Sequence, residues 1–254
     1  MEKIKDFILN EGDIYHPGFS IDSVVFGFHH NKLKVLLLKM KHTNNWALPG
    51  GFLKKNENVD DAVIRILHSR TGLKDIFLHQ FHLFGESNRI DETQNRELFK
   101  YIGTKPDPSN WFIQRFLTVG YYALVEYSRV NPQPDYTSDA CEWWDIHSIP
   151  KLIHDHNDIL KRAIEALRMN LNYHPVGYNL LPTKFTMPDL QKLYETILDK
   201  KLDRRNFQRK MLAYGILKKL NERRTGGAHK SPTLFKFDLR SYRKALKEGL
   251  KGGW

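Results

Sequence analysis

The chain has 254 residues, of which 41% are hydrophobic, and this is enough to build one large core or two modest ones. Its apolar runs are far shorter than the roughly 20 residues of a membrane helix, residues 1–9 lack the apolar stretch of a secretory signal, and its single cysteine, Cys141, cannot form an internal disulfide. We therefore expect a globular, cytoplasmic protein with no membrane segment. The net charge is +11, and all of the excess lies in residues 183–254, which hold 19 Lys and Arg against 7 Asp and Glu.

The first two thirds of the chain alternate between short apolar segments and amphipathic ones. Val, Phe and Leu recur in two early segments, and the His-His-Asn break at residues 29–31 suits a hairpin turn. Apolar residues at helical spacing from Val59 to Leu67, followed by Gly72, predict a helix with a glycine stop. The predicted strands are residues 20–28, 32–40, 46–52, 76–84, 116–127 and 142–146, and the predicted helices are residues 1–9, 57–71, 92–101 and 155–171. This mixture predicts an α+β fold.

Residues 172–182 separate two parts of the chain. They have weak periodicity, contain His174-Pro175 and Gly177, and end at Pro182, where the charge balance changes. We predict a first domain at residues 1–171, a linker at residues 172–182 and a second domain at residues 183–254.

The stretch from Gly51 to Leu73 carries a glycine, a glutamate and an arginine at a characteristic spacing. It resembles the signature of Nudix hydrolases, G-x5-E-x7-R-E-U-x-E-E-x-G-U with U aliphatic. The matching positions are Gly51, Glu57, Arg65, Leu67, Gly72 and Leu73, and the lead-in WALPG at residues 46–50 is also similar. The resemblance covers roughly residues 15–170 and implies a Nudix-like α/β/α sandwich with a mixed sheet.

Three positions that bind metal in this family do not match. In the family, three glutamates lie on one helix face and hold Mg²⁺ near a diphosphate. Here the residues are Ile66, Ser69 and Arg70, which cannot supply the anionic oxygens that Mg²⁺ needs. Asp60 and Asp61 lie a turn or more earlier on the helix and point elsewhere. We therefore expect no catalytic residue, no metal and no cofactor, and a protein that is not an enzyme.

The loop that remains can still bind a ligand without cutting it. Gly51 closes a tight Pro-Gly-Gly turn where backbone approaches a ligand closely, and Trp46 and Phe52 flank it, either to stack on a base or sugar or to join the core. In the family, Glu57 and Arg65 largely brace the loop against the helix. The candidate effector-binding residues are Trp46, Gly51, Phe52 and Glu57.

Two further features lie outside this pattern. The polar segment at residues 86–105 is an insertion relative to compact family members, and we expect a lid, a dimer contact or a long loop. The triplet His154-Asp155-His156 offers two histidine ligands with no third partner, so we expect it to have a surface or capping role.

The basic part begins with two predicted helices. Thr186 and Asp189 form a capping-box-like pair that predicts a helix over residues 186–198. Asp203 as N-cap and Gly215 as C-cap bound the second helix. The face of this second helix opposite its apolar stripe carries Arg205, Asn206 and Arg209, flanked by Gln208 and Arg204, and these side-chain types read base edges and clamp phosphates.

Two short strands, at residues 216–220 and 234–237, follow the second helix. The segment between them is basic and glycine-rich, with Arg223, Arg224, His229 and Lys230 as candidate DNA contacts. Together with the two helices it resembles a winged helix-turn-helix domain, in which the second helix enters the major groove and the wing touches the backbone or minor groove. A small helical docking domain with a solvated basic face is the alternative.

The order of the two domains, and especially LLPTKFTMPDLQKLYETILDKKLDRRNFQRKM at residues 180–211, resembles the Nudix-related transcriptional regulators of bacteria. The resemblance implies a homodimer that binds a palindromic operator in double-stranded DNA. It also implies a small-molecule effector, either ADP-ribose or a pentose such as arabinose, that fills the Nudix-like pocket and changes DNA affinity. The regulated genes would belong to NAD metabolism or sugar catabolism.

Two other functions remain open. The first is a Nudix hydrolase of a nucleoside diphosphate derivative with a nucleic-acid-tethering tail, which needs a metal site that the sequence does not provide. The second is a noncatalytic Nudix protein that binds RNA through its first domain, in which case RNA binding does not depend on residues 183–254.

Overall fold

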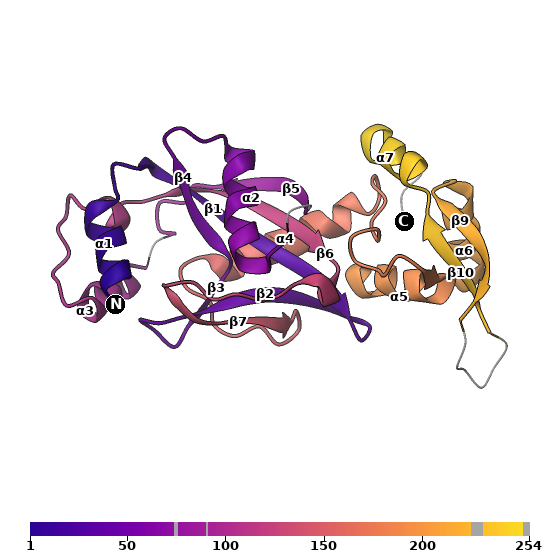
Figure 1. Cartoon of the computed structure of the whole chain (residues 1–254), viewed down its shortest axis with the longest axis horizontal. Helices are drawn as coiled ribbons and strands as arrows, with labels where there is room; N and C mark the ends of the chain where they lie inside the picture. The colour runs from indigo at the N-terminus through magenta and orange to yellow at the C-terminus, as the bar shows by residue number, and fades with distance from the viewer. Residues whose placement is uncertain (74–75, 90, 225–230, 251–254) are drawn as a thin grey trace. The chain divides into compact units, whose positions relative to one another are not determined.

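The computed structural model of the chain describes residues 1–73, 76–89, 91–224 and 231–250. It divides into two compact units (Figure 1). The first consists of Met1–Phe26, Lys34–Leu124 and Ser128–Ala163, and the second of Gly27–Leu33, Val125–Tyr127 and the chain from Ile164 onward.

A mixed sheet forms the centre of the first unit, and its described strands follow the order β3-β2-β1-β6-β5, with β4 paired to β1 and β7 paired to β2. The strands are β1 (Tyr15–His29), β2 (Lys32–Met40), β3 (Trp46–Ala47), β4 (Gly50–Lys54), β5 (Phe77–Phe84), β6 (Leu117–Val125) and β7 (Ser138–Asp145). Side chains of consecutive residues in β1, β2 and β6 are buried, which is typical of a sheet that is covered on both faces.

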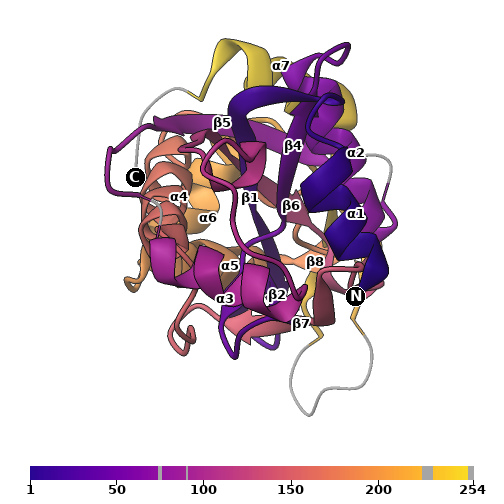
Figure 2. The same ribbon diagram turned by 90° about the vertical axis from the view of Figure 1, so that its left-hand side faces the viewer.

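Helices α2 (Val59–Thr71) and α4 (His156–Asn170) lie on opposite sides of this sheet (Figures 1 and 2). In α2, Ala62, Val63, Ile66 and Leu67 are buried, and Gly72 ends the helix with a φ of 72°, a conformation that glycine adopts without strain. The α/β/α sandwich with a mixed sheet is confirmed.

Helix α1 (Glu2–Asn10) and helix α3 (Glu92–Tyr101) share a small core of their own. It consists of Ile4, Phe7, Ile8, Leu98, Phe99 and Ile102. Asp91 caps α3 by accepting a hydrogen bond from the Thr93 amide. The insertion at residues 86–105 is therefore built around a packed helix. Short 3-10 turns, η1 (Trp111–Ile113) and η2 (Tyr127–Arg129), precede and follow β6.

The second unit contains a helix pair and a three-stranded sheet with the order β8-β10-β9. Its elements after α4 are β8 (Phe185–Thr186), α5 (Met187–Leu198), α6 (Arg204–Ala213), β9 (Leu217–Arg223), β10 (Thr233–Phe237) and α7 (Leu239–Glu248). Thr186 and Asp189 form the predicted capping box at the start of α5, and Asp203 caps α6 through the Asn206 amide. Tyr194 of α5 packs against Phe207 of α6, with 5.5 Å between ring centroids. The winged helix arrangement is confirmed.

Several predicted elements differ in the structure. The predicted strand at residues 46–52 is divided into β3 and β4, β7 begins at Ser138 instead of residue 142, and β9 ends at Arg223 instead of residue 220. Strand β1 begins at Tyr15, before the predicted start at residue 20. The C-cap of α6 is Tyr214, and Gly215 follows it with a φ of 66°. Helix α7 was not predicted, because its sequence, LRSYRKALKE, has few apolar residues and many cations. Among the helices of the described residues, none is long and apolar enough to cross a membrane.

Candidate functional site

The Nudix-like loop is held against α2 by Glu57 and Arg65. The Arg65 guanidinium donates two hydrogen bonds of 2.7 Å to the Glu57 carboxylate and a third of 3.0 Å to the carbonyl oxygen of Phe52. Hydrogen bonds from Arg65, opposed by partial burial, hold the pKa of Glu57 below its usual value. This two-pronged pair is a strong form of ion pair, and it matches the bracing role implied by the family resemblance.

The residues at the three mismatched positions have other partners. Ile66 is 4% exposed and lies against Gly51, where an added Cβ would be only 2.9 Å from the Ile66 Cδ1 atom. The Ser69 hydroxyl donates a 2.7 Å hydrogen bond to the carbonyl oxygen of Ile66. The first position is thus apolar and packed, and the second turns its oxygen back onto the helix.

Arg70, at the third position, ties a distant loop to α2. Its guanidinium pairs with the Asp135 carboxylate at 2.5 Å, and its carbonyl oxygen accepts a 3.0 Å hydrogen bond from the Gln133 amide. Burial would raise the pKa of Asp135, but Arg70 and the hydroxyls of Thr137 and Ser138 outweigh it, so that the pKa is lowered. A cation therefore stands where the family has a metal-binding glutamate.

These residues do not fit a magnesium ion. Mg²⁺ needs several hard oxygen ligands with negative charge, and Ile66, Ser69 and Arg70 offer one neutral hydroxyl and a repelling cation. Asp60 accepts a 2.8 Å hydrogen bond from the Tyr121 hydroxyl, so its carboxylate is engaged elsewhere. Over the described parts of the chain, no group of three or more His, Cys, Asp or Glu residues could hold a metal ion.

A cavity of about 560 Å³ opens beside the loop and lies within the first unit. Part of its wall is aromatic, formed by Phe7, Tyr15, Phe52, Phe112, Phe116 and Tyr136. Phe52 packs against several rings of this group, and its ring centroid lies 5.0 Å from that of Phe116, 5.7 Å from that of Phe112 and 5.8 Å from that of Phe7. The volume is within the usual range for small-molecule sites, and the wall offers ring faces for stacking.

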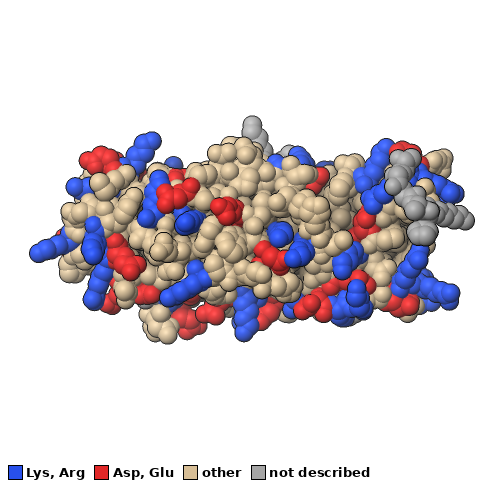
Figure 3. Space-filling model, turned by 90° about the horizontal axis from the view of Figure 1, so that it is seen from below, with Lys and Arg blue, Asp and Glu red and all other residues tan. Residues whose placement is uncertain are grey.

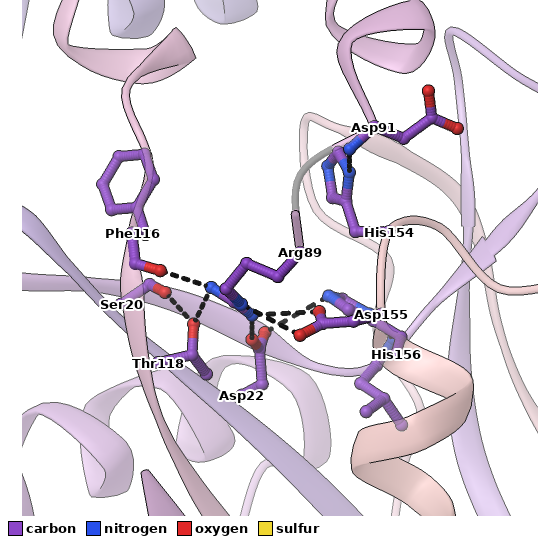
Figure 4. Close-up of polar contacts among 10 residues, drawn as sticks. Ser20, Asp22, Arg89, Asp91, Phe116, Thr118, His154, Asp155 and His156 are labelled. Carbon is purple, nitrogen blue, oxygen red and sulfur yellow. Dashed lines mark hydrogen bonds and ion pairs between the residues drawn. The ribbon is translucent and has the colours of Figure 1, made fainter. Parts of the chain in front are cut away.

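The polar part of the wall is organised around Arg89 from the insertion (Figure 4). Arg89 donates to both oxygens of Asp155 at 2.9 and 3.0 Å, to the Phe116 carbonyl oxygen at 2.8 Å and to the Thr118 hydroxyl at 2.7 Å. Its Nη2 atom also lies 3.7 Å from the Asp22 carboxylate. The Arg89 side chain is only 6% exposed, so this network is a buried and well-satisfied ion cluster.

The expected surface or capping role of His154 and His156 was wrong, because both line the cavity. The Nδ1 atom of His156 accepts a 3.0 Å hydrogen bond from the Leu48 amide, and its Nε2 atom lies 3.6 Å from Asp22. The Nδ1 atom of His154 accepts a 3.2 Å hydrogen bond from the Asp91 amide. Burial, and next the neighbouring His156, lower the pKa of His154 to about 4.

The candidate effector residues fall into two groups. Gly51 and Phe52 line the cavity, as does Arg65. Trp46 and Glu57 are not among the lining residues. Trp46 packs edge-on against Trp144 with 5.0 Å between ring centroids, and Glu57 is paired with Arg65.

Sequence reasoning missed several charged residues that line the cavity, namely Asp22, Lys54, Arg89 and Asp135. Asp22 carried a detectable signal, because a carboxylate stands inside the otherwise apolar strand segment at residues 21–26. The pairing of Arg89 with Asp155 carried none, because each residue lies in a polar segment and they are 66 residues apart.

Helix α6 presents the five side chains that were predicted to contact DNA. Phe207 and Met211 are buried, and all five candidates are exposed, namely Arg204, Arg205, Asn206, Gln208 and Arg209. The Arg209 guanidinium donates a 3.0 Å hydrogen bond to the Asn206 side chain. Figure 3 shows Lys and Arg side chains on this face of both units, interspersed with Asp and Glu.

The wing residues have different positions. Arg223 is the last residue of β9 and is exposed, whereas it was predicted in the loop. Arg224 forms two hydrogen bonds, of 2.6 and 3.2 Å, with Asp189 of the α5 capping box. His229 and Lys230 lie outside the described residues.

Comparisons with known proteins agree with both units. The family model of the NUDIX domain matches residues 18–167, and that of the NrtR DNA-binding winged helix domain matches residues 177–237. The ADPR responsive transcriptional repressor NtrR of Acinetobacter baylyi is 27% identical over 239 residues, which cover 91% of this chain and 86% of the relative. An ADP-ribose pyrophosphatase of Methanocaldococcus jannaschii is 26% identical over 149 residues, which cover 58% of this chain and 72% of the relative.

Solved structures show the same fold. The crystal structure of Shewanella oneidensis NrtR is 25% identical, with a TM-score of 0.71 over 93% of this chain and 100% of that one. The same protein complexed with a 27mer DNA is 24% identical, with a TM-score of 0.72 over 93% of this chain and 99% of that one. The chain therefore belongs to the NUDIX domain family and, with its NrtR DNA-binding winged helix domain, to the Nudix-related transcriptional regulators.

Proposed function

We propose that this protein is a transcriptional repressor that binds an operator through its winged helix domain and ADP-ribose through its NUDIX domain. The observation that carries the proposal is the combination of a NUDIX domain with no fitting metal ligands and a winged helix domain with an exposed basic helix, α6. A relative that aligns with 91% of the chain is an ADPR responsive repressor, and this supports both DNA binding and ADP-ribose as the effector.

The cavity favours ADP-ribose over a pentose such as arabinose. Its aromatic wall can stack on a nucleobase, and Lys54 in its lining can attract a diphosphate, whereas Arg65 and Arg70 beside it are paired with Glu57 and Asp135. A free pentose has neither an aromatic ring nor a phosphate. It would leave both parts of the wall without a partner.

We further propose that the domain binds ADP-ribose without hydrolysing it. Ile66, Ser69 and Arg70 replace the metal ligands of the family, and Arg70 is already paired with Asp135. Hydrolysis is the second candidate function, because a pyrophosphatase is among the relatives. Release of AMP from ADP-ribose with Mg²⁺ present, at a rate above that of a heat-inactivated sample, would favour it.

The assembly and location are part of the same proposal. We propose that the protein acts as a homodimer on a palindromic operator, since a two-fold protein matches a two-fold DNA site. Its place of action would be the cytoplasm, where the DNA of a bacterium lies. The division into residues 1–171, 172–182 and 183–254 also remains a proposal.

The test is operator binding by the full chain, measured with DNA from upstream of its own and neighbouring genes at fixed salt. ADP-ribose and L-arabinose are titrated in parallel, with AMP as a control ligand. We expect specific binding that ADP-ribose alone changes. If the protein protects no site in these DNA fragments, the proposed function is wrong. If arabinose alone changes operator binding, arabinose takes the place of ADP-ribose as the effector.

A further inference from the structure

We propose that helix α7 is a second DNA-binding element, which binds phosphates beside the site that α6 contacts. This inference rests on the proposed DNA-binding function. Four cations of this ten-residue helix are exposed, namely Arg240, Arg243, Lys244 and Lys247. At about 100° per residue, all four fall within an arc of about 100°, so they form one basic stripe along the helix.

The opposite face of α7 is anchored in the fold. Tyr242 is 4% exposed, and its hydroxyl donates a 2.7 Å hydrogen bond to the carbonyl oxygen of Pro175. Its ring centroid lies 5.0 Å from that of Phe237 and 5.5 Å from that of Tyr178. Asp238 caps the start of the helix by accepting a hydrogen bond from the Ser241 amide. The basic stripe is therefore held on a rigid support and turned away from the core.

Helix α7 begins beside the end of α6. The Asp238 amide donates a 2.9 Å hydrogen bond to the carbonyl oxygen of Ile216, which lies three residues beyond the last residue of α6, Ala213. Strand β10 leads from the wing, at Thr233, directly into α7 (Figure 1). The stripe begins just beyond one end of β10, and Thr233 lies at the other end of this strand, so that the two can contact the backbone at different points of one duplex.

The spacing of the cations is unfavourable without an anionic partner. Arg240 has like charges three and four residues further on, at Arg243 and Lys244, and Lys247 is in the same relation to both of these. Like charges at these spacings destabilise a helix. The pair of Lys244 with Glu248, at 3.8 Å, is exposed and weak. A line of phosphates would relieve this repulsion.

A nucleic acid fits this stripe better than an anionic membrane does. A helix that lies on a membrane inserts its apolar face, but on this face of α7 Tyr242 is 4% exposed and packed within the unit, which leaves exposed apolar surface mainly at Leu239, 40% exposed. The matched winged helix model ends at residue 237, directly before α7, so the stripe adds to the surface that this model describes.

The test compares two variants of the full chain with equal loss of charge. The first is R240Q/R243Q/K244Q/K247Q, and the second replaces four exposed lysines of the first unit, K3Q/K100Q/K105Q/K161Q. Affinity for the operator duplex and for a random-sequence duplex of equal length is measured from 50 to 300 mM NaCl. Circular dichroism checks that both variants fold, and R240K/R243K serves as a charge-preserving rescue.

We expect the α7 variant to bind both duplexes at least about tenfold more weakly near 100 mM salt, with the slope of log K against log salt reduced by roughly 2 to 4. The control variant and the rescue should keep the wild-type slope. An unchanged slope in the α7 variant, or an equal reduction in the control, overturns the inference. The inference is also wrong if the wild type binds phosphatidylserine vesicles, the α7 variant loses this binding, and the salt dependence of DNA binding is the same in both. If the wild type shows no preference for operator DNA, the proposed function fails, while the slope on random DNA still tests α7.

Discussion

Arg89 is the residue that holds the polar wall of the cavity together. It is 6% exposed, pairs with Asp155 at 2.9 Å and lies 3.7 Å from Asp22, and the side chains of these two residues are 14% and 10% exposed. Removal of one partner leaves buried charges without compensation, which costs more than the pair contributes as a whole. We expect Arg89→Ala to lower the free energy of unfolding by about 3–5 kcal/mol in urea denaturation. Arg96→Ala, in the same insertion but with a 75% exposed side chain, should change it by less than about 0.5 kcal/mol. Equal effects would mean that the cluster is not buried in solution.

His154 makes stability depend on pH. Its pKa in the folded protein is about 4, below the usual value of about 6.5 that applies to the unfolded chain. Between these values the unfolded chain binds a proton and the folded chain does not, so stability is full above pH 6.5 and falls as the pH drops toward 4. The expected loss is up to about 3 kcal/mol.

The measurement is urea denaturation of the wild type and of His154→Gln at pH 7, 6, 5 and 4.5. Burial also lowers the pKa of His42 to about 4, and this contribution is present in both the wild type and the variant. The difference between the two curves isolates His154. Parallel curves over this pH range would contradict the assignment.

Among the elements of the second unit, we propose that α6 contacts base edges and that α7 binds phosphates. If Arg205 and Arg209 contact base edges, each substitution by alanine should weaken operator binding by about 1–3 kcal/mol and lower the preference for operator over random DNA. Arg243→Ala in α7 is the matched control, and it should weaken binding to the operator duplex and to the random-sequence duplex by the same factor. Electrophoretic or anisotropy titrations on the two duplexes give both quantities. Equal losses on both duplexes for Arg205→Ala and Arg209→Ala would rule out base contacts by α6.

For the whole molecule, deletion of residues 183–254 separates the possible functions. We expect the remaining chain to bind ADP-ribose in calorimetry and to lose binding to operator DNA, because α5, α6, both wing strands and α7 are removed. RNA that still bound with unchanged affinity would instead indicate a noncatalytic NUDIX protein that uses its first domain. Point variants of the full chain at Phe52 and Phe116 provide the complementary control, since they should weaken ADP-ribose binding and leave unliganded operator binding intact.

The sequence by itself determined the two domain types and the ends of several helices. The NUDIX spacing from Gly51 to Leu73 lies within one loop and one helix, so it can be read without knowledge of distant residues. The capping box of Thr186 and Asp189 and the N-cap at Asp203 are local in the same sense, and both are present in the structure. The charge contrast between residues 1–182 and 183–254 needed only counting.

Only the tertiary structure decided which residues form the cavity and which cations remain exposed. Arg89 meets Asp155 across 66 residues of chain, and Arg70 meets Asp135 across 65, distances at which sequence periodicity carries no information. For the same reason Arg224, predicted to contact DNA, was not expected to pair with Asp189. Side-chain partners of this kind are set by how strands and helices pack, because hydrogen bonds and burial depend on distance in space, whereas helix caps and amphipathic spacing depend on neighbours a few residues apart.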